Sequence, residues 1–197
     1  MTRRLTATLF YSIDGIAPDP YKFQRDSFDA GLAQFIDESI EHVDDTILGR
    51  TSYTEWADYW PIVTDGPDAR FAAFINHTRK HIASRHLTQD DLNWENSTLI
   101  TGDLVEYVRA LKETEGRDIA VQGSLSVVRQ LVDAGLIDTL TLIIHPAIAG
   151  KGRGLFQGAL PTRLKLHDVQ TTELGNILIT YSVVDATKPG NTFRSEE

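Results

Sequence analysis

Hydrophobic and polar residues alternate between short apolar runs and amphipathic stretches over the first two thirds of the chain. Short apolar runs bounded by polar residues are typical of buried strands, whereas apolar residues spaced three and four apart indicate helices. Strands are predicted at residues 5–11, 46–48, 82–84, 97–100 and 118–122. Helices are predicted at residues 28–42, from Gly49 to Trp60, from Pro67 through Ile75, after a Thr101 cap, and from Ser124 to a left-handed Gly135.

The pattern changes after Ile137, where three strand-like runs follow one another without helices between them. These runs cover residues 140–145, 163–172 and 177–184, and Leu174, Gly175 and Asn176 form a hairpin turn between the last two. We therefore expect a three-layer α/β fold with a mixed, mostly parallel sheet and antiparallel C-terminal strands. Residues 1–185 are expected to form one domain, and residues 186–197 a C-terminal tail.

Four of the predicted strands end in small polar residues. The run at residues 46–48 breaks at Gly49, Arg50 and Thr51, where Gly49 allows close backbone approach and Thr51 is a candidate helix cap. The free amides of the following helix, together with Arg50, form a potential anion site. Similar exits recur at Ser84, at Thr101 and at residues 123–124. Because parallel strands place their carboxyl ends on one edge, the exits should share a crevice suited to an extended, phosphate-bearing ligand.

Composition narrows the classes of partner. The 197 residues include 19 Lys and Arg against 28 Asp and Glu, and the net charge of -9 argues against generic nucleic-acid or anionic-membrane binding. The chain has no cysteine, which excludes disulfides, thiolate metal sites and cysteine nucleophiles. No run approaches the length of a membrane-spanning helix, and the apolar residues 5–11 are too short for a signal sequence, so we expect a cytoplasmic protein.

Several other features have more than one reading. Asp14 could orient a substrate or assist its protonation, but Asp-Gly is also a common turn pair. The glycine-rich residues 150–154 are not followed by a helix, so they do not form a dinucleotide fingerprint; whether Lys151 or Arg153 reaches a substrate phosphate stays open. His77 and His81 have the spacing of zinc ligands, but the chain leaves the helix near Arg79, so no metal site is predicted.

Five stretches together resemble the dihydrofolate-reductase-like family, and specifically the reductase domain of riboflavin biosynthesis, which is the C-terminal part of a bifunctional deaminase-reductase, and its stand-alone relatives. The stretches are residues 12–15, 48–53, 84–85, 121–124, and 145–146 followed by 150–156. Their order and spacing cover nearly the whole chain. The resemblance implies an oxidoreductase that uses NADPH and acts on a small-molecule substrate, and it favours a homodimer, as do the apolar C-terminal strands.

The resemblance also implies roles for individual residues. Gly49, Arg50 and Thr51 would hold cofactor phosphates, Ser84 and Arg85 would meet the adenosine 2′-phosphate, and Gly123, Ser124, Leu125 and Ser126 would hold the pyrophosphate. Ile13, Asp14 and Gly15 would lie beside the nicotinamide, with Asp14 as the candidate catalytic residue. Two arginines at strand exits, with no acidic residue beside them to receive a ribose hydroxyl, favour NADPH over NADH.

The substrate is less clearly indicated. Reduction of 5-amino-6-(5-phosphoribosylamino)uracil is the best-known activity of the family the chain resembles, and dihydrofolate reduction is its neighbour. The chain departs from that family in two places: it has Ser124 and Leu125 where many relatives have a second glycine, and it lacks a longer substrate segment after the first strand. Two alternatives are a nucleotide-binding protein without turnover and a flavin-binding module.

Overall fold

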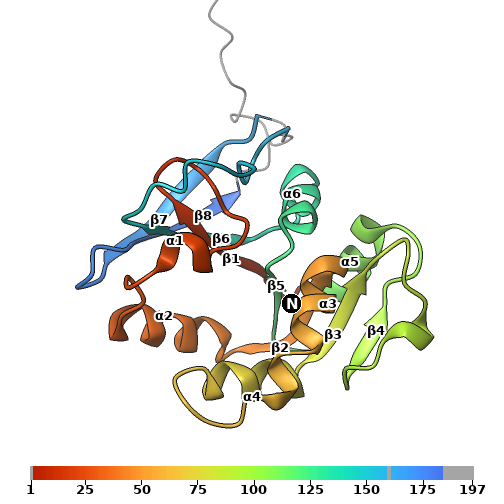
Figure 1. Cartoon of the computed structure of the whole chain (residues 1–197). Helices are drawn as coiled ribbons and strands as arrows, with labels where there is room; N and C mark the ends of the chain where they lie inside the picture. The colour runs from red at the N-terminus through yellow and green to blue at the C-terminus, as the bar shows by residue number, and fades with distance from the viewer. Residues whose placement is uncertain (1, 159–160, 184–197) are drawn as a thin grey trace, which may run out of the picture.

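The computed structural model describes residues 2–158 and 161–183, which form an eight-stranded sheet between two layers of helices (Figure 1). The strands are β1 (Leu5–Ser12), β2 (Val43–Gly49), β3 (Arg79–Ala83), β4 (Ser97–Leu99), β5 (Asp118–Gln122), β6 (Thr139–His145), β7 (Leu164–Thr171) and β8 (Ile177–Val183). The helices are α1 (Tyr21–Gln24), α2 (Ala30–Ile40), α3 (Arg50–Ala57), α4 (Ala69–His77), α5 (Leu104–Lys112) and α6 (Leu125–Asp133), with two 3-10 turns, η1 (Trp60–Ile62) and η2 (Gln89–Asp91).

The strand order in the sheet is β4-β3-β2-β5-β1-β6-β8-β7. Strands β1 to β6 run parallel to one another, whereas β8 pairs antiparallel with both β6 and β7. The predicted fold class, a mixed and mostly parallel sheet with antiparallel C-terminal strands, is therefore confirmed. The carboxyl ends of β2, β3, β4 and β5 consequently lie along one edge of the sheet, as predicted for parallel strands that share a ligand-binding crevice.

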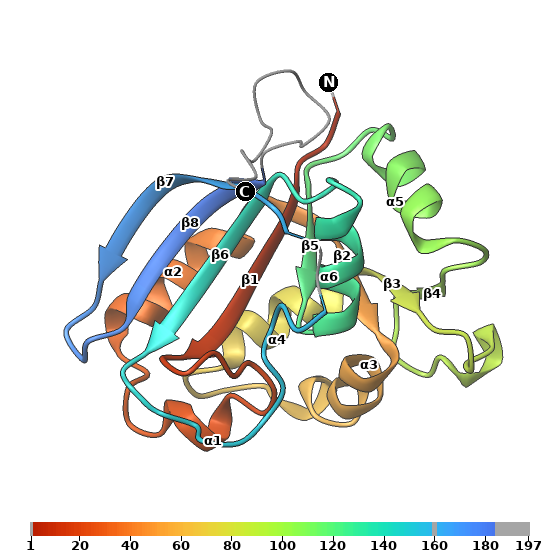
Figure 2. The ribbon, with the colours of Figure 1, turned by 90° about the horizontal axis from the view of Figure 1, so that it is seen from above.

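The two faces of the sheet are covered by different helices, and Figures 1 and 2 show α2 and α4 on the opposite side from α6. Helices α5 and α6 pack on the large central core, which includes Leu5, Ile47 and Ile119. Helix α2 covers Ile143 and Leu178 on the other face. A separate cluster around α3 and α4 surrounds Leu48, Tyr53, Ile75, Ile82 and Trp94. This arrangement fixes the helices on both sides of the sheet edge where the four strand exits meet.

Several predicted helix starts were wrong. Gly49, not Thr51, is the N-cap of α3, and this helix ends at Ala57 before the 3-10 turn η1. Helix α5 is capped by Asp103 and not by Thr101, because the Asp103 carboxylate accepts hydrogen bonds from the amides of Val105 and Glu106. A carboxylate at this position also interacts favourably with the positive end of the helix dipole.

Other boundaries shift by a few residues. Helix α2 is shorter than predicted because Asp29 caps it through the amide of Leu32, and α4 starts after its N-cap Asp68 instead of at Pro67. The short helix α1 lies in the segment predicted to be an irregular loop. The left-handed glycine expected after α6 is confirmed, since Gly135 has a φ of 64°. The predicted tail, residues 186–197, lies outside the described residues.

Candidate functional site

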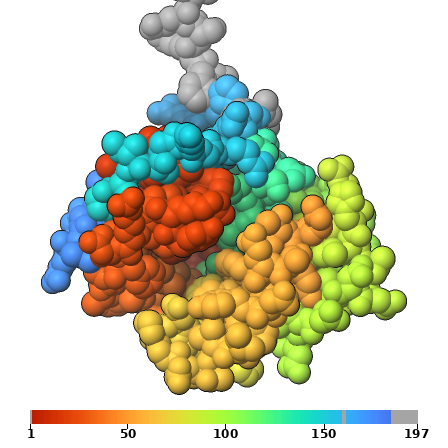
Figure 3. Space-filling view, viewed as in Figure 1, coloured from red at the N-terminus to blue at the C-terminus, as the bar shows by residue number. Residues whose placement is uncertain are grey.

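A cleft with a volume of about 1570 Å³ opens at the carboxyl edge of the sheet. Figure 3 shows the hollow between the segment that contains α1 and α2 and the one that contains α3 and α4. Most of the residues predicted to bind the cofactor line this cleft. They are Gly49, Arg50, Thr51, Ser84, Arg85, Gly123, Ser124, Leu125 and Ser126. Residues that are up to 77 positions apart in the sequence therefore share one cavity, from Gly49 to Ser126.

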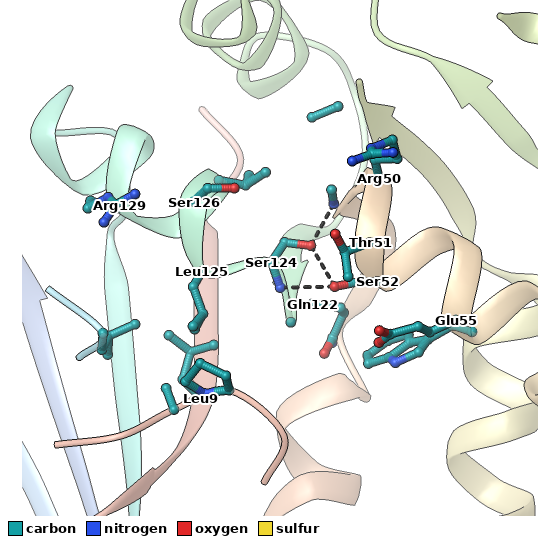
Figure 4. A pocket seen from close by; sticks show the side chains of 18 of the residues that line it. Leu9, Arg50, Thr51, Ser52, Glu55, Gln122, Ser124, Leu125, Ser126 and Arg129 are labelled. Carbon is teal, nitrogen blue, oxygen red and sulfur yellow. Dashed lines mark hydrogen bonds between the residues drawn. The ribbon is translucent and has the colours of Figure 1, made fainter. Parts of the chain in front are cut away.

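The exits of β2 and β5 are joined by a short hydrogen-bond network (Figure 4). The Gly49 amide donates to Ser124 Oγ at 2.6 Å, Ser124 Oγ donates to Ser52 Oγ at 2.9 Å, and the Ser124 amide donates to Ser52 Oγ at 3.1 Å. A Cβ atom on Gly49 would lie 3.0 Å from Ser124 Oγ, and one on Gly123 would lie 2.8 Å from Ser52 Oγ. Glycine at these two positions therefore permits the starts of α3 and α6 to approach each other.

The same junction leaves two helix N-termini facing the cleft. The N-cap residues Gly49 and Ser124 make no side-chain capping bond, so the first-turn amides of α3 and α6 receive no capping acceptor from them. Gly123 and Ser124 both have left-handed backbone conformations, with φ of 59° and 54°. These conformations turn the chain sharply at the start of α6, where the positive end of the helix dipole favours anions.

Basic side chains also line the cleft. Arg50, Arg85 and Arg153 lie in it and form no ion pair with any described residue, while Arg129 donates to the Gln157 carbonyl at 2.5 Å. The Ser84 hydroxyl accepts from the amides of His86 and Leu87, which closes a turn beside Arg85. We call the exits of β2 to β5, with the first half of α6, the basic arm of the cleft.

Three of the predicted site residues, Ile13, Asp14 and Gly15, do not line the cleft. The Ile13 side chain is 64% exposed. The Asp14 carboxylate accepts hydrogen bonds from the Ala149 amide at 2.9 Å, from the Ser12 hydroxyl at 2.7 Å and from the Gly150 amide at 2.7 Å. These donors, that of Ala149 first, lower the pKa of Asp14 to about 2. Asp14 therefore ties the turn after β1 to the glycine-rich segment at residues 150–158.

The other half of the cleft is lined by aromatic and acidic side chains. Its walls come from residues 8–40 and 55–71, and we call it the aromatic arm. The Trp60 carbonyl accepts from Asn76 Nδ2 at 2.9 Å, and Asn76 Oδ1 accepts from the Trp94 indole at 2.8 Å, which fixes η1 against α4. From the sequence alone, Trp56 and Trp60 could stack on a ligand ring or pack in the core. No local motif marks the arm as a whole, since its residues are scattered from Phe10 to Phe71.

The histidines with zinc-like spacing point to different partners. His81 Nε2 lies 2.7 Å from the buried carboxylate of Asp45, and its Nδ1 lies 2.8 Å from the Tyr107 hydroxyl. His77 Nδ1 lies 2.7 Å from the Ala73 carbonyl. Over residues 2–158 and 161–183, no group of three or more His, Cys, Asp or Glu side chains is placed to hold a metal ion.

A family model described as the RibD C-terminal domain matches residues 3–180, which is most of the chain. The chain belongs to the RibD C-terminal domain family. This member of the family is 29% identical, over 156 residues, to the uncharacterized protein YyaP of Bacillus subtilis (strain 168), a match that covers 78% of this chain and 79% of that protein.

Solved structures share the fold of this RibD C-terminal domain family member. A putative riboflavin biosynthesis protein from Shewanella sp. PV-4 superposes with a TM-score of 0.68 at 16% identity, covering 94% of this chain and 100% of that one. A diaminohydroxyphosphoribosylaminopyrimidine deaminase/5-amino-6-(5-phosphoribosylamino)uracil reductase from Thermotoga maritima gives 0.65 at 16% identity, covering 93% of this chain and 57% of that one.

The fold extends to a second kind of reductase. A dihydrofolate reductase from Enterococcus faecalis, complexed with NADP(H) and RAB-propyl, superposes with a TM-score of 0.59 at 15% identity, covering 94% of this chain and 100% of that one. The predicted dihydrofolate-reductase-like fold and the resemblance to the riboflavin reductase domain are therefore both confirmed. None of the helices in the described part of the chain combines the length and apolarity needed to cross a bilayer.

Proposed function

We propose that this protein is an NADPH-dependent oxidoreductase that reduces a C=N or C=O bond in a small heterocyclic substrate. The observation that carries the proposal is that two helix N-termini share one cleft with Arg50 and Arg85, neither of which forms an ion pair with a described residue. Binding at micromolar strength requires roughly 8 kcal/mol. One helix terminus contributes about 0.3 to 2 kcal/mol, so several anion-binding elements must act together.

The residues of the basic arm suit an extended dinucleotide phosphate. The close contact between Gly49 and Ser124 leaves no room for a side chain at Gly49 or Gly123, which keeps the two helix starts together. In our proposal, the amides at the start of α3 and α6 bind the phosphates near Arg50, and Arg85 pairs with the 2′-phosphate, which distinguishes NADPH from NADH. Charge-assisted bonds from each arginine would add about 1.5 to 3 kcal/mol before the cost of ordering the side chains.

The protein's own part in the reaction would be alignment and exclusion of water. When bound, NADPH supplies the hydride that reduces the substrate. Leu9 of the aromatic arm and Gln122 and Leu125 of the basic arm line the cleft where the two arms meet (Figure 4). We propose that these residues hold the nicotinamide against the substrate ring. The low pKa of Asp14 keeps its carboxyl ionised at neutral pH, so in this proposal Asp14 positions the rim of the cleft and does not donate a proton.

The names of the structural neighbours indicate two substrates to test first, 5-amino-6-(5-phosphoribosylamino)uracil and dihydrofolate. The deciding experiment is calorimetric titration of the protein with NADPH, NADH and FMN, followed by measurement of NADPH oxidation with pterins, aminopyrimidines and carbonyl compounds. Tight, stoichiometric NADPH binding with turnover is the expected result. NADPH binding without oxidation would favour a nucleotide-binding protein without turnover, and preferential FMN binding would favour a flavin module.

A further inference from the structure

The aromatic arm differs from the basic arm in the kind of charge it carries. Five aromatic side chains line it, two from residues 8–40 and three from residues 55–71. They are Phe10, Phe28, Trp56, Trp60 and Phe71. Trp60 packs against both Trp56 and Phe71, with ring centroids 5.9 Å and 4.8 Å apart. Walls of this kind favour a flat ring, since aromatic side chains contribute large apolar contact area and stack on planar groups.

The charged residues of this arm are acidic. Asp19, Glu55 and Asp68 line it, and no Lys, Arg or His from its segments, which are residues 8–40 and 55–71, is among the described residues that line the cleft. Asp19 pairs with Lys22 at 2.6 Å, but Glu55 and Asp68 form no ion pair with a described residue. Glu55 lies one turn beyond Ser52 on α3, on the side of the helix that faces the cleft (Figure 4). Two carboxylates without cationic partners therefore flank an aromatic wall.

From this division we infer that the aromatic arm binds a planar ring that bears amino groups or positive charge and carries no phosphate group. This inference rests on the proposed function, because it assigns the basic arm to the cofactor. A phosphate ester in the aromatic arm would face Glu55 and Asp68 without a basic side chain from that arm to neutralise it, and like charges at close range oppose binding. Ring amino groups and cations are instead attracted to carboxylates and to aromatic faces.

The inference separates this protein from the activity in the Thermotoga maritima neighbour's name, whose pyrimidine carries a phosphoribosyl group. The inference would be contradicted if Arg153 bound a phosphate group of the substrate. Arg153 lies on the segment 150–158, which reaches the turn after β1 through the bridge between Ile16 and Gly154. If Arg153 served a substrate phosphate, the phosphorylated ring would bind more tightly and would lose that advantage when Arg153 is neutralised.

The test compares two ligands that differ by one phosphate. The protein, saturated with NADP⁺ so that no turnover occurs, is titrated with 5-amino-6-(5-phosphoribosylamino)uracil and with the riboside made by removing its phosphate. We expect the riboside to bind at least about tenfold more tightly at low ionic strength. The Glu55→Lys variant should reduce or reverse that ratio, whereas Glu115→Lys, a matched change at an exposed residue outside the cleft, should leave it unchanged.

Two results would overturn the inference. One is tighter binding of the phosphorylated ligand, with a preference that Arg153→Gln removes and Glu55→Lys does not alter. The other is failure of both ligands and of unphosphorylated pterins to bind to a protein that holds NADP⁺. Failure to bind NADPH or NADP⁺ at all would contradict the proposed function itself. The cofactor titration therefore distinguishes the two kinds of failure.

Discussion

The Gly49 amide and the Ser124 hydroxyl, 75 residues apart in the sequence, form a 2.6 Å hydrogen bond that joins the exits of β2 and β5. This bond brings the N-termini of α3 and α6 to the same point of the cleft. It also depends on Gly123, because the left-handed backbone at that position turns Ser124 towards Ser52. The junction is therefore sensitive to any side chain that is added at Gly123.

The first prediction concerns Gly123→Ala. The new Cβ would lie 2.8 Å from Ser52 Oγ on a backbone with φ of 59°, so both the contact and the conformation are unfavourable. We expect a loss of about 1 to 3 kcal/mol in the free energy of unfolding and weaker NADPH binding, measured by denaturant unfolding and calorimetry. Gly66→Ala is the matched control, since Gly66 also has a positive φ but its added Cβ meets no atom within 4 Å. Equal effects on NADPH binding in the two variants would contradict the prediction.

The second prediction tests the assignment of the 2′-phosphate. Arg85→Gln removes a cleft-lining charge that has no ion-pair partner among the described residues. Losing one charge-assisted bond of about 1.5 to 3 kcal/mol should weaken NADPH binding by about 10- to 150-fold and leave NADH almost unchanged. Calorimetric Kd values for both nucleotides provide the measurement, with Arg109→Gln, an exposed residue outside the cleft, as the control. Equal losses for NADPH and NADH would refute the role of Arg85.

The sequence predicted those parts of the site whose residues lie close together along the chain. Apolar runs ending in glycine or serine predicted the strand exits, because the strand, the turn and the next helix follow one another in sequence. The left-handed conformation of Ser124 was not predicted, since that conformation is uncommon for any residue other than glycine. The aromatic arm as a whole was not predicted, because Phe28 and Phe71 line one cleft only in the folded chain and no local motif joins them. The resemblance to the reductase family implied that Asp14 lies beside the nicotinamide. In the structure, its carboxylate accepts hydrogen bonds from backbone amides of residues 149 and 150, which are distant in the sequence.

The third prediction follows from those contacts of Asp14. Asp14→Asn replaces an acceptor of three hydrogen bonds with an amide that can accept through one oxygen only. We expect severalfold faster hydrogen exchange at the amides of Ala149 and Gly150, and a higher KM with kcat largely retained. In the parent protein, the pKa of the Asp14 carboxyl is lowered from 3.8 to about 2. The stabilising hydrogen bonds from residues 149 and 150 to this carboxylate are therefore complete above pH 3.8 and are lost as the pH falls towards 2.

The control for this prediction is Asp90→Asn, a change at an exposed residue whose side chain forms no hydrogen bond or ion pair with a described residue, which should not affect exchange at residues 149 and 150. A collapse of kcat in Asp14→Asn with unchanged exchange protection would instead assign Asp14 a direct part in catalysis. The two readouts together therefore separate a positioning residue from a catalytic one.

The fourth prediction concerns Lys80 of β3, which is fully buried and whose side chain lies against the C-terminal end of α4. Its Nζ donates to the carbonyls of Ile75, Asn76 and Thr78 and lies 4.6 Å from the centroid of the Trp94 ring. Lys80 thus supports the helix end whose Asn76 side chain holds Trp60 at the aromatic arm. Burial lowers the pKa of Lys80 from 10.5 to about 8, because desolvation penalises the ammonium form.

The sign of the effect follows from proton linkage. Between pH 8 and 10.5 the unfolded chain holds a proton on Lys80 that the folded protein has released, so the free energy of unfolding should rise with pH across this window. The rise is about 1.4 kcal/mol per pH unit, or up to about 3 kcal/mol in total. Urea unfolding of the parent protein and of Lys80→Met across this range isolates the contribution, with the exposed Lys165→Met as the control. A parent protein whose stability, relative to Lys80→Met, stays flat or falls as the pH rises would show that the buried ammonium does not lose its proton there.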